Sequence, residues 1–360
     1  MRKYYIDNTR SVTILLVMLY HVIYMFNSII TDGVIGPIMK ADFLNVIQYL
    51  LYPWFMVILF IISGMCSKYY LEKHTTKEYL RARTRKLLVP STIGLLVFGW
   101  VQGCFNMAIS HAFDQMSAGI PGVIKYLIMC VSGTGVLWTI QVMWLLSIVL
   151  LLLRRIEKGR LETLGGKVGI LGLILLGVLV WLSAQILNTP IIAVYRFGIY
   201  GFTFLLGYYV FSHEEVTDCL KKYAIYLLVV ALGLGILYTV FCYGTNYAVV
   251  PGVSHPLAIA YGWMMCLAVI GCMKRWADKS GSISQFLAAK SFGLYVFHYL
   301  ALSVCAYLLT EYTKLPGVVI YLCTALSAFF GAWLLYEIIS RIPVLRWCIL
   351  GIKKEKEHVL

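Results

Sequence analysis

Long apolar runs, each close to the length of a membrane-spanning helix, recur along the whole chain and constrain its fold more than any other feature. A helix needs about 20 mostly apolar residues to cross the hydrocarbon core of a bilayer. Of the 360 residues, 61% are hydrophobic and 13% are charged. A soluble domain carries roughly a quarter charged residues, so this chain has too little polar surface to face water on all sides. We predict an all-α fold, a polytopic membrane helix bundle.

The apolar runs predict about ten transmembrane helices. Their expected ranges are 11–30, 46–67, 87–109, 136–153, 168–187, 191–211, 223–243, 255–273, 290–310 and 316–339. The segment 110–135 is interrupted by Pro121, Gly122, Gly133 and Gly135, which favours a short re-entrant or interfacial piece. We expect residues 1–345 to form a single membrane domain and residues 346–360 to form a basic cytoplasmic tail.

The basic residues predict the orientation of these spans. Loops on the cytoplasmic side carry an excess of Lys and Arg. Of the 30 Lys and Arg residues, only Lys40, Lys125 and Lys314 fall in predicted outside loops, while Arg10 and Arg196 fall at or within spans. All the others lie in the predicted inside loops or at the two ends. Both termini are therefore expected to be cytoplasmic.

Several other classes of protein are disfavoured. The net charge of +14 sits in short loops between spans, which indicates membrane orientation rather than nucleic-acid binding. The first apolar run is too long for the core of a cleaved signal peptide. The ten cysteines form no Cys-x-x-Cys pair, and the outer-loop residues His111, Asp114 and His255 have no metal-ligand spacing. We expect no bound metal.

Ionisable side chains inside spans are few: Arg10, His21, Arg196, His298 and Glu337. Such residues are costly in a bilayer and are candidate functional residues by default. Arg10 and His21 are eleven residues apart, which on a helix is three turns plus about 20°, or about 16 Å along one face. Either Arg10 holds an anionic ligand while His21 moves a proton, or Arg10 extends to the headgroups and His21 bonds a neighbouring helix.

The Arg-x10-His spacing and four other motifs resemble membrane acyltransferase family 3, the bacterial O-acyltransferases of surface glycans. Phe60-Ile61-Ile62-Ser63-Gly64-Met65 resembles the family's Phe-x-x-Ser-Gly-Phe motif. Tyr79 to Pro90 (YLRARTRKLLVP) resembles its cytoplasmic Arg-x-x-Arg segment. Gly135-Val136-Leu137-Trp138 is similar to its Leu-Trp-Phe segment, and Ser291-Phe292-Gly293-Leu294-Tyr295-Val296-Phe297-His298 to its Ser-x-Gly-x-Tyr-x-x-His pattern. The Asp7-x-x-Arg10 opening is most similar to the glucan-succinylating branch, glucans biosynthesis protein C.

The resemblance implies an enzyme of the bacterial cytoplasmic membrane. It would move an acetyl, succinyl or other short acyl group from cytoplasmic acyl-CoA, as co-substrate, to a hydroxyl of an extracytoplasmic glycan. His21 would be the catalytic residue, with Arg10 orienting the donor. His21 would act either as a general base or through an acyl-imidazole. Beyond acyl-CoA, the acceptor glycan and the bilayer, no partner or bound cofactor is expected.

The resemblance assigns acyl-CoA binding to Ser63, Gly64, Arg83, Arg85 and Lys86. Lys86 stands where the family has a second Arg; it keeps the charge but lacks the planar guanidinium fork, and Arg85 is the alternative. Ser63 and Gly64 could equally serve close helix packing.

Four further residues are expected to position the acceptor or to stabilise the bundle: Tyr295, His298, Arg196 and Trp138. Tyr295 and His298 are three apart and therefore neighbours on one helical face. Val136, two residues before Trp138, stands where many relatives have a polar residue.

Two other classes of function compete with the enzyme. A multi-pass transporter or flippase could use the intramembrane Arg10 and His21 as a substrate or proton site. The two halves of the chain share no motif, however, which disfavours an inverted-repeat transporter. A membrane sensor or partner subunit would leave the Arg-x10-His spacing unexplained.

Overall fold

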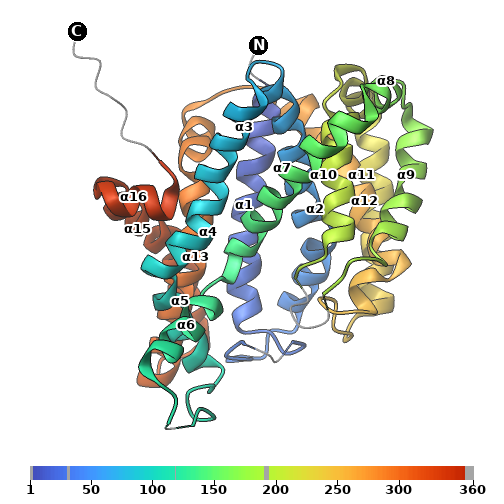
Figure 1. Ribbon diagram of the computed structural model, residues 1–360. Coiled ribbons are helices and arrows are strands. Elements are labelled where there is room, and N and C mark those ends of the chain that lie inside the picture. The colour runs from blue at the N-terminus through green and yellow to red at the C-terminus, as the bar shows by residue number, and fades with distance from the viewer. Residues whose placement is uncertain (1–2, 31–32, 118, 190–193, 353–360) are drawn as a thin grey trace. The chain divides into compact units, whose positions relative to one another are not determined.

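The structure is a computed structural model that describes residues 3–30, 33–117, 119–189 and 194–352. Within these ranges the regular structure is helical, and the only β-type pairing is an isolated bridge between Asn188 and Arg196 (Figure 1). The predicted all-α polytopic bundle is therefore confirmed. The last part of the predicted tail, residues 353–360, lies outside the described residues.

The helices follow one another with short connections. The α-helices are α1 (Tyr4–Met25), α2 (Phe43–Leu71), α3 (Thr76–Arg83), α4 (Val89–Gly94), α5 (Trp100–Ile109), α6 (Gly122–Ser132), α7 (Trp138–Glu157), α8 (Arg160–Gly165), α9 (Ile170–Ser183), α10 (Phe197–Leu206), α11 (Glu214–Cys242), α12 (Pro256–Trp276), α13 (Ser282–Tyr312), α14 (Gly317–Leu326), α15 (Ala332–Arg341) and α16 (Pro343–Leu350). Between them lie the π-helical segments η1 (Thr84–Leu88), η2 (Leu95–Gly99), η4 (Gly207–Phe211) and η6 (Ser327–Gly331), and the 3-10 segments η3 (Gly135–Leu137) and η5 (Gly252–Ser254).

Seven helical stretches in the described part of the chain are long and apolar enough to cross a membrane. They are Phe43–Leu71, Thr76–Ile109, Gly135–Glu157, Glu214–Cys242, Pro256–Trp276, Ser282–Tyr312 and Gly317–Arg341. Each overlaps one predicted span. The other three predicted spans correspond to α1, which has 22 residues, to α9 with 14 residues, and to the apolar stretch Phe197–Phe211. The number ten and the cytoplasmic termini stay predictions.

The segment 110–135 contains an 11-residue helix, α6, which is too short to cross a bilayer alone. It packs closely on α5 through glycine. A Cβ at Gly103 would lie 1.7 Å from the Met129 carbonyl oxygen, and a Cβ at Gly133 would lie 1.9 Å from the Gly99 carbonyl oxygen. Gly133, within this segment, and Gly103, on α5, therefore let two backbones touch.

The chain forms two compact units whose segments alternate along the sequence. Unit 1 comprises Met1–Tyr20, Ala41–Tyr79 and Leu145–Ser291. Unit 2 comprises His21–Lys40, Leu80–Trp144 and Phe292–Leu360.

Helix α2 of unit 1 is largely buried and packs against α10 at backbone distance. A Cβ at Gly64 would lie 2.0 Å from the Phe204 carbonyl oxygen, and a Cβ at Gly207 would lie 2.1 Å from the Ile61 carbonyl oxygen. Aromatic stacking continues this interface, because the rings of Phe60 and Tyr200 lie 4.5 Å apart and nearly parallel. In a bilayer, such small-residue contacts supply the van der Waals packing that brings helices together.

Unit 2 has an apolar core that joins the end of α1 to α13, α14 and η6. Its buried members are Val22, Met25, Phe26, Ile109, Leu302, Ala306, Ile320 and Ala328. Helix α16 packs on α4 and ends at Leu350. At the next residue, Gly351, a Cβ would lie 2.2 Å from the Arg85 carbonyl oxygen. The first residues of the predicted tail therefore belong to a packed helix.

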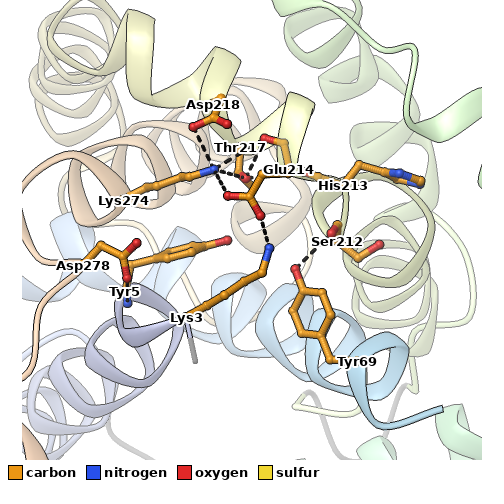
Figure 2. Close-up of polar contacts among 10 residues, drawn as sticks. All are labelled: Lys3, Tyr5, Tyr69, Ser212, His213, Glu214, Thr217, Asp218, Lys274 and Asp278. Carbon is orange, nitrogen blue, oxygen red and sulfur yellow. Dashed lines mark hydrogen bonds and ion pairs between the residues drawn. The ribbon is translucent and has the colours of Figure 1, made fainter. Parts of the chain in front are cut away.

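A polar network in unit 1, drawn in Figure 2, surrounds Lys274 at the end of α12. The side chain of Lys274 is 5% exposed, and its ammonium lies 2.6 Å from Oε1 of Glu214 and 2.9 Å from Oδ1 of Asp218. It also donates to the Thr217 hydroxyl at 2.8 Å. Lys3 forms an ion pair with the same Glu214. These contacts join the segment before α1 to α11 and α12.

The first turn of α1 is anchored by the loop after α12. The Tyr5 N–H donates to Oδ1 of Asp278 at 3.0 Å, and Nδ2 of Asn8 donates to the carbonyl of Ala277 at 2.7 Å. Because the first N–H groups of a helix have no partner within the helix, the Asp278 carboxylate satisfies one of them and complements the helix dipole. The start of α1 is thus fixed within unit 1.

We expect Lys274→Met to lower the free energy of unfolding by about 1–3 kcal/mol, because hydrogen bonds to two carboxylates are lost while Met keeps the apolar stem. Thermal unfolding of the purified protein in detergent measures the change. Lys221→Met, at an exposed position of α11, is the matched control and should leave the melting temperature unchanged. Equal melting temperatures for the two variants would contradict a stabilising role for the network.

We expect Gly64→Ala to destabilise the protein by about 1–3 kcal/mol, because the added methyl group meets backbone that cannot move aside. Gly233→Ala is the matched control, since nothing lies within 4 Å of a Cβ at that position of α11. It should be neutral or stabilising by up to about 1 kcal/mol, because Ala favours helix over Gly. The same detergent melts compare both, and an unchanged Gly64→Ala melt would exclude the close packing as a source of stability.

Candidate active site

Helix α1 carries both Arg10 and His21, as the spacing predicted. Nη2 of Arg10 lies 2.9 Å from Oδ1 of Asp7, one helical turn earlier, and the Arg10 side chain is 36% exposed. Asp7 therefore orients the guanidinium and balances part of its charge. A guanidinium has five N–H donors, so Arg10 can bind Asp7 and an anionic ligand together.

The structure brings His21 and His298 into direct contact, although they are 277 residues apart in sequence. Nε2 of His298 lies 3.2 Å from Nδ1 of His21, and the ring centroids are 5.1 Å apart. His298, on α13, is 0% exposed, and its Nδ1 lies 2.8 Å from the carbonyl oxygen of Tyr295. Both residues belong to unit 2. Two residues singled out separately thus form one pair of imidazoles.

Aromatic rings enclose this pair. The Tyr299 ring meets the His21 ring edge-on at 5.2 Å, and the Tyr24 ring does so at 6.4 Å. Neither tyrosine was singled out from the sequence. Tyr24 lies three residues after His21 and therefore on the same helical face, which was the available signal. Tyr299 directly follows His298, but nothing local shows that it faces α1.

Tyr295 joins two of the motifs. Its hydroxyl donates to the Val136 carbonyl at 2.6 Å and forms a second hydrogen bond with the Thr139 hydroxyl at 2.9 Å. The contact uses the backbone of Val136, which any residue provides, so an apolar side chain at this position does not weaken it. Trp138 begins α7 and is buried. In the sequence it lies between Val136 and Thr139. Tyr295 therefore holds α13 to the start of α7.

Ser63 and Gly64 lie on α2, in unit 1. Gly64 makes the close backbone contact with α10 described above, and Ser63 is buried, with its carbonyl accepting a hydrogen bond from the Ser67 hydroxyl at 2.7 Å. Helix packing accounts for Gly64. A role for Ser63 and Gly64 in acyl-CoA binding stays a prediction.

Arg85 and Lys86 lie in the π-helical segment η1, directly after Arg83 at the end of α3. Such segments are rare and occur frequently at functional sites. Lys86 is exposed, whereas Arg83 and Arg85 are half-buried. Nε of Arg85 is shielded from solvent and has no hydrogen-bond partner among the described residues. Trp144 donates from Nε1 to the Thr84 hydroxyl at 3.1 Å, which fixes the segment against α7. The three cations are thus grouped at one helix junction of unit 2.

Arg196 precedes α10 in unit 1 and is 5% exposed. Its Nη2 donates to the Val253 carbonyl at 3.0 Å, and the guanidinium lies 6.0 Å from the Tyr200 ring centroid. These contacts join the beginning of α10 to the segment that contains Val253. Binding of an acceptor by Arg196 stays a prediction.

Comparison with known proteins identifies the family. The sequence model of a family described as an acyltransferase domain matches residues 3–337. No match to a curated protein or to a solved structure was found. The matched region contains Arg10, the His21–His298 pair, and the helices that carry them. The chain therefore belongs to the acyltransferase 3 family and is a multi-pass membrane acyltransferase.

Proposed function

We propose that the protein transfers an acetyl group, or another short acyl group such as succinyl, from cytoplasmic acyl-CoA to a hydroxyl of an extracytoplasmic glycan. The contact between His21 and His298 carries this proposal. An imidazole inside a spanning bundle is costly, and a second imidazole in contact with it can orient it for proton transfer. Membership of an acyltransferase family supports acyl transfer as its use. The resemblance to bacterial O-acyltransferases supports the glycan acceptor and the bacterial cytoplasmic membrane.

In the proposed reaction His21 acts on the acceptor hydroxyl as a general base. The hydroxyl oxygen attacks the thioester carbonyl, forming the new C–O bond, while its proton passes to His21. The C–S bond then breaks, and the departing CoA thiolate takes that proton. In the alternative route, His21 itself attacks the thioester carbonyl, the C–S bond breaks and CoA departs as a thiolate, leaving an acyl-imidazole. The acceptor hydroxyl then attacks the acyl group and displaces His21, and its proton passes to the CoA thiolate.

Arg10 orients the donor in this proposal. The Asp7 carboxylate fixes the guanidinium, and the half-exposed side chain can present further N–H groups to a phosphate or carbonyl oxygen.

Arg83, Arg85 and Lys86 bind the CoA phosphates in this proposal. Clustered cations at a junction near the predicted cytoplasmic end suit a ligand rich in phosphate. The shielded Nε of Arg85 lacks a partner among the described residues, so a phosphate oxygen would satisfy it. The family resemblance also supports acyl-CoA binding by Ser63 and Gly64, and a role in positioning the acceptor for Trp138, Tyr295 and Arg196.

Membranes containing the protein should consume labelled acyl-CoA and deposit the label on cell-surface glycan, as mass analysis of the glycan would show. His21→Asn should reduce this transfer by about 10²–10⁴-fold, the range of general-base catalysis. The Asn amide can occupy the place of Nδ1 and preserve the fold, but it supplies no Nε2.

The matched control is His111→Asn, an exposed position with a positive φ of 53° that Asn tolerates. It should retain full transfer. An active His21→Asn enzyme would contradict the assignment of His21. Uptake of a substrate without thioester turnover would instead support the transporter.

Arg85→Gln should raise the KM for acyl-CoA by about tenfold or more, because a charge-assisted hydrogen bond contributes about 1.5–3 kcal/mol. The effect should shrink when the donor thioester lacks the 3′-phosphate. Arg160→Gln, which neutralises an exposed cation of α8, should leave the KM unchanged. Equal KM values for the two variants would exclude Arg85 from the donor site.

A further inference from the structure

The carbonyl of Tyr295 determines where the protons of the two histidines lie. A carbonyl oxygen can only accept, so Nδ1 of His298, 2.8 Å away, must donate to it. His298 is fully buried, and its two ring nitrogens contact uncharged groups, the Tyr295 carbonyl and the His21 ring. An unpaired buried charge is strongly disfavoured, so the His298 ring is neutral and its Nε2 carries a lone pair.

This tautomer of His298 fixes the tautomer of His21. The lone pair on His298 Nε2 faces Nδ1 of His21 at 3.2 Å. A hydrogen bond exists only if Nδ1 of His21 carries a proton, because two lone pairs at this distance would repel each other. A neutral ring protonated at Nδ1 has its lone pair on Nε2. The nitrogen that can accept a proton or attack a thioester is therefore Nε2 of His21.

We propose that His298 is a positioning residue that holds His21 in its reactive tautomer through the chain Tyr295 carbonyl, His298, His21. This inference rests on the proposed function. It gives a role to His298, for which the sequence left both acceptor positioning and bundle stability open. When Nε2 of His21 takes the acceptor's proton, the resulting imidazolium still donates from Nδ1 to His298 and is stabilised by that bond. In the Ser-His-Asp triad a carboxylate orients the catalytic histidine and holds its tautomer; here a neutral imidazole takes the place of that carboxylate.

The surroundings of the pair favour orientation over packing alone. Tyr295, whose carbonyl begins the chain, is itself held by its hydroxyl bonds to Val136 and Thr139. Tyr299 contacts the rings of both histidines, at 5.2 Å from His21 and 6.4 Å from His298. Contacts from α1, α7 and α13 therefore hold the Tyr295 carbonyl and both imidazole rings in place.

Two amide variants of His298 test the proposal, because the Gln side chain is one methylene group longer than the Asn side chain. In Gln the amide oxygen reaches the place of Nε2 and can accept from His21. In Asn the amide reaches only the place of Nδ1, so it can bond the Tyr295 carbonyl but not His21. His298→Gln should retain activity within a few-fold. His298→Asn should lower kcat by about tenfold or more, because a catalytic histidine that loses its orienting partner can adopt the unreactive tautomer, and the KM for acyl-CoA should stay unchanged.

A purely structural His298 would give a different result, because both amides are polar and of similar size. Equal activity of the two folded variants, judged by their detergent melts, would overturn the proposal. If His21→Asn is inactive in the same assay, the proposed function survives that outcome. If the wild type transfers no acyl group, the proposed function itself fails.

A spectroscopic measurement tests the tautomer without reference to activity. In protein labelled with 15N at histidine, the His21 and His298 signals, assigned by their loss in the His21→Asn and His298→Gln variants, should both show a protonated Nδ1 and an unprotonated Nε2. In His298→Asn the His21 signal should show a mixture of tautomers. A wild-type His21 protonated at Nε2 would overturn the proposal.

Discussion

A polar side chain in the interior of a membrane bundle has no water to bond, so its partner must come from the protein. The contact between His21 and His298 is the strongest expression of this constraint here. It joins the second half of α1 to α13 and fixes their mutual register within unit 2. Hydroxyl groups obey the same constraint locally: Thr9, Ser67 and Ser91 each donate to the carbonyl four residues earlier in their own helix. The histidine pair differs because an imidazole ring cannot bond its own helix through both nitrogens. His298 bonds its own helix through Nδ1, so its Nε2 needs a partner on another helix.

Glycine provides the second means of joining helices in this protein. Lipid tails are as apolar as leucine, so apolar burial alone does not draw helices together in a bilayer. Contacts at backbone distance do, and Gly64 with Gly207 in unit 1 and Gly103 with Gly133 in unit 2 provide them. The motif that contains Ser63 and Gly64 is therefore structural at its glycine, whatever its serine binds.

Charge is placed at helix ends. Lys274 bridges Glu214 and Asp218, and Asp278 caps the first turn of α1. Asp7 holds Arg10 on the same helix. The beginning of the helix that carries the proposed catalytic histidine is thus held by the Asp278 carboxylate within unit 1. The end of the same helix belongs to the apolar core of unit 2 around Met25 and Phe26.

The sequence by itself determined the class of fold, the approximate position of each long span, and the common face of Arg10 and His21, because apolar length and helical period are local properties of the chain. It also indicated His298 and Tyr295 through a motif, but not that His298 contacts His21. That contact joins residues 277 positions apart, and only the packing of α1 against α13 decides it. Tyr299 was not found, since a tyrosine within an apolar run carries no sign of the face it occupies. The π-helical turn at Arg85 and the short helices α6 and α9 were likewise set by tertiary packing, which local hydropathy does not record.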